Sequence, residues 1–111
     1  MDIKTEERDG IVILYPQGEI DIINVANVKN NIYKVIEEGK IKIILNLQDI
    51  MYVDSSAVGM IVESFFYIKG KGGDMRLCGL KNELKDILSS ANLENTLHID
   101  ISEEASFKAF T

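Results

Sequence analysis

The sequence is poor in the residues that build disulfides and metal sites. Its 111 residues include one cysteine, Cys78, and one histidine, His98. A lone cysteine cannot close an internal disulfide, which agrees with a reducing compartment, and we expect a cytoplasmic protein. Because Cys78 lies in an apolar segment, we expect a buried and inert thiol. Too few ligands remain for a metal site, and no cofactor is expected.

Long apolar runs and an excess of basic residues are also missing. The longest apolar runs, 11–15 and 58–62, are far shorter than the roughly 20 residues that cross a bilayer, so we expect no direct membrane insertion. The first residues lack the basic and apolar segments of a secretion signal. The chain has 12 basic and 18 acidic residues and a net charge of −6, which disfavours nucleic acid and anionic membranes as partners.

The sequence does have the composition of a folded domain. Hydrophobic residues make up 46% and charged residues 27% of the chain, and its length fits one domain over residues 1–111. No segment predicts an obligate dimer interface. A monomer that meets its partners transiently is therefore the simplest expectation.

Hydrophobic periodicity predicts alternating strands and helices. The Asp9-Gly10 dipeptide between the runs 3–8 and 11–15 predicts an opening β-hairpin, because it readily adopts positive φ angles. Apolar residues at spacings of three and four predict helices, and β-branched or alternating apolar runs predict strands. Helices are expected at 25–36 after an Asn24 N-cap, at 56–69, around 84–91 and from a Ser102 cap to 110, and further strands at 41–47, 75–78 and 97–101.

This order of elements predicts an α/β fold. We expect a small mixed, mostly parallel β-sheet with an N-terminal β-hairpin, flanked by about four α-helices. Segment 48–55 is expected to be a loop. The glycine-rich segment 70–73 lacks the spacing of a phosphate-binding loop and is typical of a helix end followed by a turn.

Asp54, Ser55 and Ser56 stand where a loop becomes a helix, and open α/β sheets carry their sites at such places. On spacing alone a helix N-cap is the commoner explanation, because Asp and Ser accept hydrogen bonds from first-turn amides. A second interpretation is that a serine is phosphorylated, because helix N-terminal amides favour a phosphate. The two interpretations are compatible.

Two carboxylates, Glu19 and Asp21, form a second candidate site between a strand and a helix. Paired acids can serve acid/base chemistry or hold a metal. Because no third ligand follows nearby, a solvated turn is the main expectation, and partner binding is the better functional one. Nucleophilic catalysis has little support, since Ser55 and Ser56 lack a G-x-S-x-G elbow and His98 lies in the last expected strand.

Four segments together resemble the STAS domain of bacterial anti-sigma-factor antagonists. They are 18–21 (Gly-Glu-Ile-Asp), the strand-like 43–47, the block 53–59 (Val-Asp-Ser-Ser-Ala-Val-Gly) and 72–78. The resemblance runs without gaps from the hairpin to the last helix. Its specificity lies in the Asp-Ser-Ser-x-x-Gly block combined with Gly-Glu-x-Asp. The resemblance implies the STAS fold, a small mixed sheet flanked by helices.

The resemblance implies a binding switch, with no catalysis by the domain itself. The unphosphorylated protein of such a family binds an anti-sigma factor that is also a serine kinase, which frees a sigma factor for RNA polymerase. The kinase uses ATP to phosphorylate the serine after the motif's aspartate, and a serine phosphatase reverses the step. Here that serine is Ser55, and Ser56 is the less favoured acceptor. The implied partner-binding residues are Glu19, Asp21, Asn24, Asp54, Ser55, Ser56, Ala57, Val58 and Gly59.

The sequence departs from the family pattern at two places. Ala57 replaces the first glycine of the block and Val58 replaces a leucine, so a stiffer loop is expected. Ile22 and Ile23 are more apolar than the usual residues after the Gly-Glu-x-Asp motif, and Asn24 stands where threonine is common. If the two isoleucines are exposed they form part of a contact patch, and if buried they belong to the core.

Two other functions stay open at the level of sequence. The domain could be a non-switching STAS subunit of a sensory complex or of a lipid or anion transport complex, whose assembly would be insensitive to ATP. It could also be a small enzyme that uses Ser55 with a carboxylate, in which case a serine-reactive phosphonate would label it.

Overall fold

The computed structural model describes residues 3–111, so the domain expected over 1–111 includes two residues outside this range. The α/β class and the four expected helices are confirmed. The elements are β1 (Lys4–Arg8), β2 (Ile11–Tyr15), β3 (Gly18–Ile20), α1 (Val25–Glu37), β4 (Lys42–Asn46), β5 (Ile50–Val53), α2 (Ser55–Gly70), β6 (Asp74–Cys78), α3 (Asn82–Ser90), β7 (His98–Ile99) and α4 (Glu103–Ala109).

Five strands form the main sheet, in the order β1-β2-β4-β6-β7. β1 is antiparallel to β2, whereas the other neighbouring strands run parallel to each other. In the turn between β1 and β2, φ is 53° at Asp9 and 79° at Gly10, as a type I′ hairpin turn requires. The predicted hairpin and the mostly parallel sheet are therefore both confirmed.

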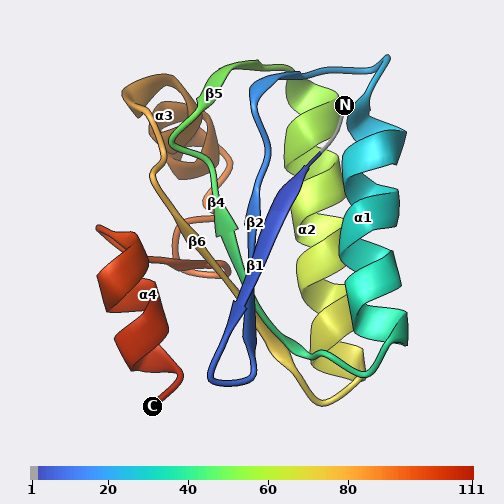
Figure 1. Ribbon diagram of the computed structural model, residues 1–111. Helices are drawn as coiled ribbons and strands as arrows, with labels where there is room; N and C mark the ends of the chain where they lie inside the picture. Colours follow the sequence, from blue (N-terminus) through green and yellow to red (C-terminus); the bar gives the residue numbers. More distant parts are fainter. Residues whose placement is uncertain (1–2) are drawn as a thin grey trace.

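Helices cover both faces of the main sheet. Figure 1 shows α1 and α2 side by side on one face and α4 on the other. Val12 and Leu14 of β2 pack in the cluster under α1 and α2, whereas Ile11 and Ile13 pack in a second cluster with Phe107 of α4. Because each face is covered, successive residues of this strand are apolar. β1, at the sheet edge, has all five residues exposed.

The segment predicted as a loop contains a strand. β5 pairs in parallel with β3 in a separate two-stranded sheet. Met51 and Tyr52 in the middle of β5 are exposed, whereas Ile50 and Val53 at its ends are buried. Burial therefore does not follow the period of two by which a strand is recognised in a sequence. The two short strands lead directly into Asp21 and Asp54.

The final strand is shorter than predicted. β7 has two residues, and Ile101, expected to continue the alternation, is 97% exposed. The backbone N–H of Asp100 donates to the carbonyl of Leu77 at 2.8 Å, and the chain then leaves the sheet. The predicted cap of α4 is confirmed, since the Ser102 hydroxyl accepts a 3.1 Å hydrogen bond from the N–H of Ala105.

A polar network joins β6 to the start of α4. Arg76 Nε and Nη2 donate to the two Asp100 carboxylate oxygens at 2.7 and 3.1 Å, and the Ser106 hydroxyl donates to Oδ2 at 2.7 Å. These hydrogen bonds, that of Arg76 foremost, hold the pKa of Asp100 below its usual value. The carboxylate is only 14% exposed, so the network is shielded from solvent.

Replacing this carboxylate is expected to destabilise the fold in a pH-dependent way. Asp100→Asn should lower the free energy of unfolding at pH 7 by about 2 kcal/mol, because the guanidinium of Arg76 loses its hydrogen-bonded carboxylate and keeps only the longer 3.7 Å contact with Asp74. A carboxyl whose folded pKa is depressed stabilises the fold above its unfolded pKa of about 4 and loses that effect as pH falls through the folded pKa. Urea titrations should therefore show a smaller wild-type advantage at pH 3 than at pH 7.

The control for this prediction is an exposed ion pair. Glu7→Gln removes the pair of Lys40 and Glu7, whose side chains are 45% and 48% exposed, and should change stability by less than about 0.5 kcal/mol. An Asp100→Asn deficit that is the same at both pH values would contradict the assigned role of the carboxylate.

Candidate functional site

Asp54 is the N-cap of α2. Its Oδ1 accepts hydrogen bonds from the N–H groups of Ser56 at 2.9 Å and Ala57 at 3.4 Å, and the Ser56 hydroxyl also donates to it. The cap interpretation of the motif is thus confirmed for Asp54. Because the aspartate and not a serine is the cap, α2 begins at Ser55, one residue earlier than predicted.

The second oxygen of Asp54 binds a different loop. Its Oδ2 accepts a 3.0 Å hydrogen bond from the N–H of Ile22, 32 residues earlier in the chain, and its own N–H donates to the carbonyl of Ile20 at 3.2 Å. The hydrogen bond from the Ser56 hydroxyl, assisted by those from backbone N–H groups, lowers the pKa of Asp54. An ionised carboxylate therefore joins the β3–α1 loop to the start of α2.

The two serines of the motif differ in what their hydroxyls do. The Ser56 side chain is half-buried and donates to Asp54. Ser55 is exposed, and its hydroxyl has no hydrogen-bond partner within residues 3–111. Ser55 is also the first residue of a 16-residue helix, whose amide dipoles favour an anionic group at this end. A modifying enzyme can thus reach the Ser55 hydroxyl without breaking a bond within the domain.

The β3–α1 loop is held by its own side chains. Asp21 Oδ1 accepts from the N–H groups of Ile23 at 3.0 Å and Asn24 at 3.1 Å. The Asn24 amide accepts from the N–H of Asp21 at 2.9 Å and donates to the carbonyl of Glu19 at 2.6 Å. The predicted Asn24 cap is wrong as a side-chain contact: the residue occupies the N-cap position, but its side chain turns back into the loop.

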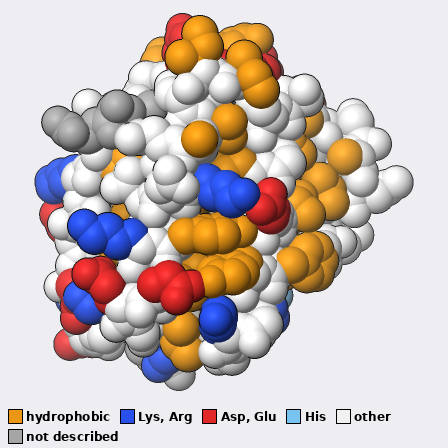
Figure 2. All heavy atoms as spheres, turned by 90° about the vertical axis from the view of Figure 1, so that its right-hand side faces the viewer, with side chains coloured by type: hydrophobic (Ala, Val, Ile, Leu, Met, Phe, Trp, Pro, Cys, Tyr) orange, Lys and Arg blue, Asp and Glu red, His pale blue; other side chains and the backbone are white. Residues whose placement is uncertain are grey.

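This rigid loop turns two apolar side chains outward. Ile22 is 74% and Ile23 is 89% exposed, which settles the question left open by the sequence. They belong to a surface patch and not to the core. Figure 2 shows apolar side chains projecting at the upper end of the α1–α2 face, where Figure 1 places the starts of both helices. Exposed apolar groups beside a polar site mark a surface suited to a protein partner.

The structure brings most of the predicted site residues to one end of the molecule. The link between Asp54 and Ile22 places the Asp21–Asn24 loop beside the start of α2. Glu19 is exposed next to that loop. Further along the block, Ala57 is fully buried, Val58 is half-buried and Gly59 is exposed. The surface at this end therefore consists of the loop, the first serine and the exposed side of the first turns of α2.

Within the described residues, the side chains that could serve catalysis or metal binding do not cluster or are engaged with other partners. Within residues 3–111, no three His, Cys, Asp or Glu side chains gather as metal ligands. His98 Nδ1 lies 2.8 Å from Asp74 Oδ2, in a pair that does not include Ser55. Burial raises the pKa of the Cys78 thiol to about 11, which agrees with the inert thiol expected from the sequence.

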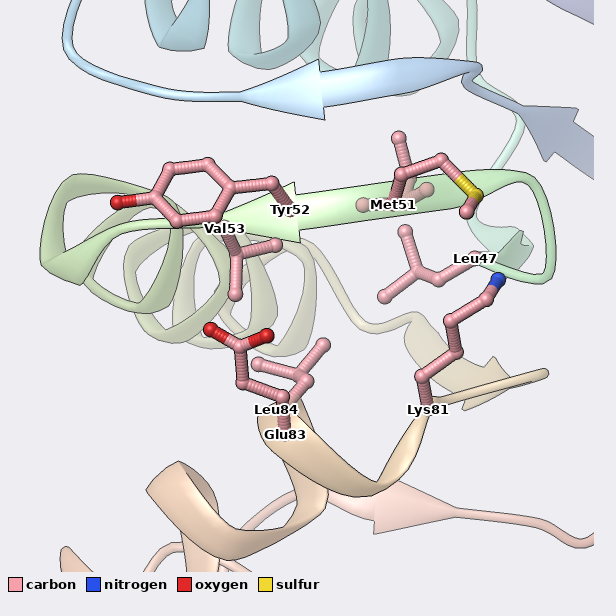
Figure 3. Close-up of a pocket in the computed structure, with 8 residues that line it drawn as sticks. Leu47, Met51, Tyr52, Val53, Lys81, Glu83 and Leu84 are labelled. Carbon is pink, nitrogen blue, oxygen red and sulfur yellow. The ribbon is translucent and has the colours of Figure 1, made fainter.

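One hollow beside the site was not foreseen from the sequence. Figure 3 shows the residues that line it, on β5 and at the start of α3; Lys81 and Glu83 are exposed, whereas Leu47 and Leu84 are buried. The Lys81 ammonium is engaged, since Nζ donates to the carbonyl of Gln48. No serine, histidine or cysteine is among the residues that line the hollow. It forms only when β5 packs near α3, a contact without a local sequence signal.

Among the helices of residues 3–111, none has both the length and the apolar character needed to cross a membrane.

Comparison with known proteins gives consistent matches over almost the whole chain. A family model described as STAS domain matches residues 2–106. The chain is 32% identical over 92 residues to a Thermotoga maritima protein provisionally named an anti-sigma factor antagonist, covering 82% of this chain and 81% of that protein. It is 27% identical over 104 residues to the anti-sigma-B factor antagonist of Bacillus subtilis, covering 94% and 93%. A crystal structure of a Thermotoga maritima protein with the same provisional name superimposes with a TM-score of 0.91 at 27% identity, covering 96% of this chain and 92% of that one.

Proposed function

The chain belongs to the STAS domain family, and from that premise we propose that it is an anti-sigma factor antagonist. It binds an anti-sigma factor and thereby releases a sigma factor to RNA polymerase. The names of the relatives support this function, as does the exposed apolar patch of Ile22 and Ile23 beside Ser55. In this role the domain binds and does not catalyse a reaction, and it acts in the cytoplasm without a cofactor.

Phosphorylation of Ser55 is proposed to switch the antagonist off. The single observation that carries this proposal is the exposed Ser55 hydroxyl, free of partners within residues 3–111, directly after the Asp54 cap. The anti-sigma factor would itself be the serine kinase that uses ATP, and a serine phosphatase would restore the active form. Ser56 is the weaker acceptor, because its hydroxyl already donates to Asp54 and is half-buried.

A phosphate on Ser55 would keep its charge unneutralised within the domain. Asp54 already occupies the amides of Ser56 and Ala57 that an N-terminal phosphate would otherwise bind. Within residues 3–111, neither Asp21 nor Asp54 forms an ion pair with a lysine or arginine, and the ammonium of Lys29 is paired with Glu63. The added charge of about −1.5 to −2 would therefore face the partner.

The test is intact-mass analysis with site mapping after incubation with ATP in a lysate of the host. We expect the wild-type chain to gain one phosphate, mapped to Ser55. Ser55→Ala should gain none, whereas the matched variant Ser56→Ala should be phosphorylated about as fast as the wild type. Both substitutions remove one hydroxyl at adjacent positions, so the pair separates the acceptor from its neighbour.

Three other results would count against the proposal. Phosphate on Ser56 would reassign the acceptor. No phosphate under growth and stress conditions alike would favour a non-switching STAS subunit. Labelling of Ser55 by a serine-reactive phosphonate would favour an enzyme.

A further inference from the structure

Strand β5 pairs with another strand along one edge only. Within residues 3–111 its single partner is β3, in the two-stranded sheet. Ile20 of β3 pairs with Val53, and the N–H of Asp54 donates to the Ile20 carbonyl at 3.2 Å. In a parallel ladder this arrangement turns the N–H and C=O of Val53 away from β3, and neither group has a hydrogen-bond partner within residues 3–111. Because Val53 is only 5% exposed, these groups favour a ligand that supplies both hydrogen bonds.

The chain does not place a third strand beside β5. In the main sheet β4 lies between β2 and β6, and β3 and β5 follow β2 and β4 along the chain. β6 instead ends at Cys78, and the chain continues into α3. The hollow of Figure 3, the β5–α3 hollow, lies at this position, lined by Tyr52 and Val53 of β5 and by the buried Leu47 and Leu84. An extended segment placed here would take the position that a continued β6 would occupy.

Two strands with a free edge, β1 and β5, differ in how they are protected from pairing. β1 has one neighbour, β2, and four of its five residues (Lys-Thr-Glu-Glu-Arg) are charged. Charge on an edge strand is a common protection against pairing with another chain. β5 reads Ile-Met-Tyr-Val, without charge or proline, and its Met51 and Tyr52 side chains are 69% and 47% exposed. The edge of β5 therefore favours strand pairing, whereas that of β1 opposes it.

The free edge and the hollow together specify an extended, apolar segment. Successive side chains of a strand point to opposite sides, so one set of alternate residues would enter the hollow. β1 of a second copy does not fit, because Lys4, Glu6 and Arg8 make one of its alternate sets and Glu7 belongs to the other. β7, at the far edge of the main sheet, has only two residues. The segment is therefore expected from a different protein.

We propose that the anti-sigma factor adds an extended segment to the free edge of β5 and places one apolar side chain in the β5–α3 hollow. Main-chain hydrogen bonds give such strand addition its affinity, and pockets for alternate side chains give it specificity. This partner is favoured by continuity, because β5 ends at Val53, two residues before Ser55. The inference rests on the proposed function, since it assigns a binding mode to the same partner. It adds a surface of β5 and α3, outside the β3–α1 loop and the first turns of α2.

Amide hydrogen exchange of the chain, alone and with the purified anti-sigma factor, tests the strand pairing. The Val53 N–H should exchange at least about tenfold more slowly in the complex, because it gains an acceptor, whereas the amides of β1 should keep their rates. Met51→Lys adds a charge at the free edge and should weaken binding, measured by calorimetry, about tenfold. The matched control is Ile101→Lys, at an apolar side chain that is 97% exposed and does not line the hollow, and it should bind like the wild type.

Thermal unfolding of the same variants separates binding from folding. Met51 and Ile101 are both exposed, so both variants should melt within a few degrees of the wild type. If Met51→Lys proves unstable, the Val53 amide decides on the wild-type chain alone. An unchanged Val53 exchange rate in a complex that does form, or a stable Met51→Lys that binds as tightly as the wild type, would overturn the inference and leave the proposed function standing. A wild-type chain that does not bind the anti-sigma factor would overturn both.

Discussion

Phosphorylation of Ser55 is expected to weaken binding to the anti-sigma factor by about 100-fold, which corresponds to about 2.8 kcal/mol. The reason is electrostatic. The phosphate adds about two negative charges beside the ionised Asp54. The Asp54 carboxylate already accepts the hydrogen bonds of the Ser56 and Ala57 N–H groups at this helix start, so these are not available to the phosphate. Closing an interface over such a group leaves a charge that is both desolvated and repelled by its neighbours. Calorimetry with the purified anti-sigma factor, using chain made with phosphoserine at position 55, measures the change.

Two variants control this prediction. Ser55→Ala should bind about as tightly as the wild type, because the hydroxyl has no partner within residues 3–111 whose loss would cost affinity. Ser55→Asp adds one charge on a shorter side chain and should fall between the wild type and the phosphorylated chain. A phosphorylated chain that binds as tightly as Ser55→Ala would show that charge at this position does not control the interface.

Gly73→Ala is expected to cause the largest loss of stability, about 3 kcal/mol or more. A Cβ on Gly73 would lie 2.2 Å from the backbone oxygen of Ile41 and 2.5 Å from its Cβ. The same region anchors the start of β6, since the N–H of Asp74 donates to the Ile41 carbonyl at 2.9 Å. Because the clash involves backbone, a rotamer change cannot relieve it. Urea unfolding of the variant measures the loss.

The neighbouring glycine is the matched control. Gly72 has a φ of +84°, but a Cβ there would meet nothing within 4 Å. Gly72→Ala should therefore cost only the strain of a left-handed residue, about 1 kcal/mol. Equal losses for the two substitutions would mean that crowding against Ile41 is not the reason for glycine at position 73.

These two glycines illustrate what the sequence could predict. The run of glycines after α2 correctly predicted a helix end, because a positive φ after a helix is a local signal. The close approach of Gly73 to Ile41 depends on how β4 and β6 align. No pattern within a few residues reports that alignment.

The candidate site shows the same difference between local features, which the sequence predicts, and long-range contacts, which it does not. The Asp54 cap and the hairpin turn were predicted because their partners lie within three residues. The link from Asp54 to Ile22 and the pairing of β3 with β5 join segments about 30 residues apart. They give no periodicity, and the segment containing β5 was wrongly expected to be a loop. The exposure of Ile22 follows from this long-range geometry and could only be posed as a question from the sequence.

Asn24 shows how a local rule can fail. Asparagine before a helical run is a common N-cap. Here the Asn24 side-chain amide accepts a hydrogen bond from the N–H of Asp21 and donates one to the carbonyl of Glu19. The side chain therefore stabilises the loop and does not cap the helix. The loop that presents Ile22 and Ile23 is thereby fixed, at the expense of a side-chain cap on α1.

Release of a sigma factor from its complex with the anti-sigma factor tests the proposed function most directly. The preformed complex is mixed with the unmodified chain or with chain carrying phosphoserine at position 55, and free sigma factor is quantified by size-exclusion chromatography. We expect the unmodified chain to free the sigma factor and the phosphorylated chain to leave the complex intact. Equal release by both forms, or release by neither, would contradict it.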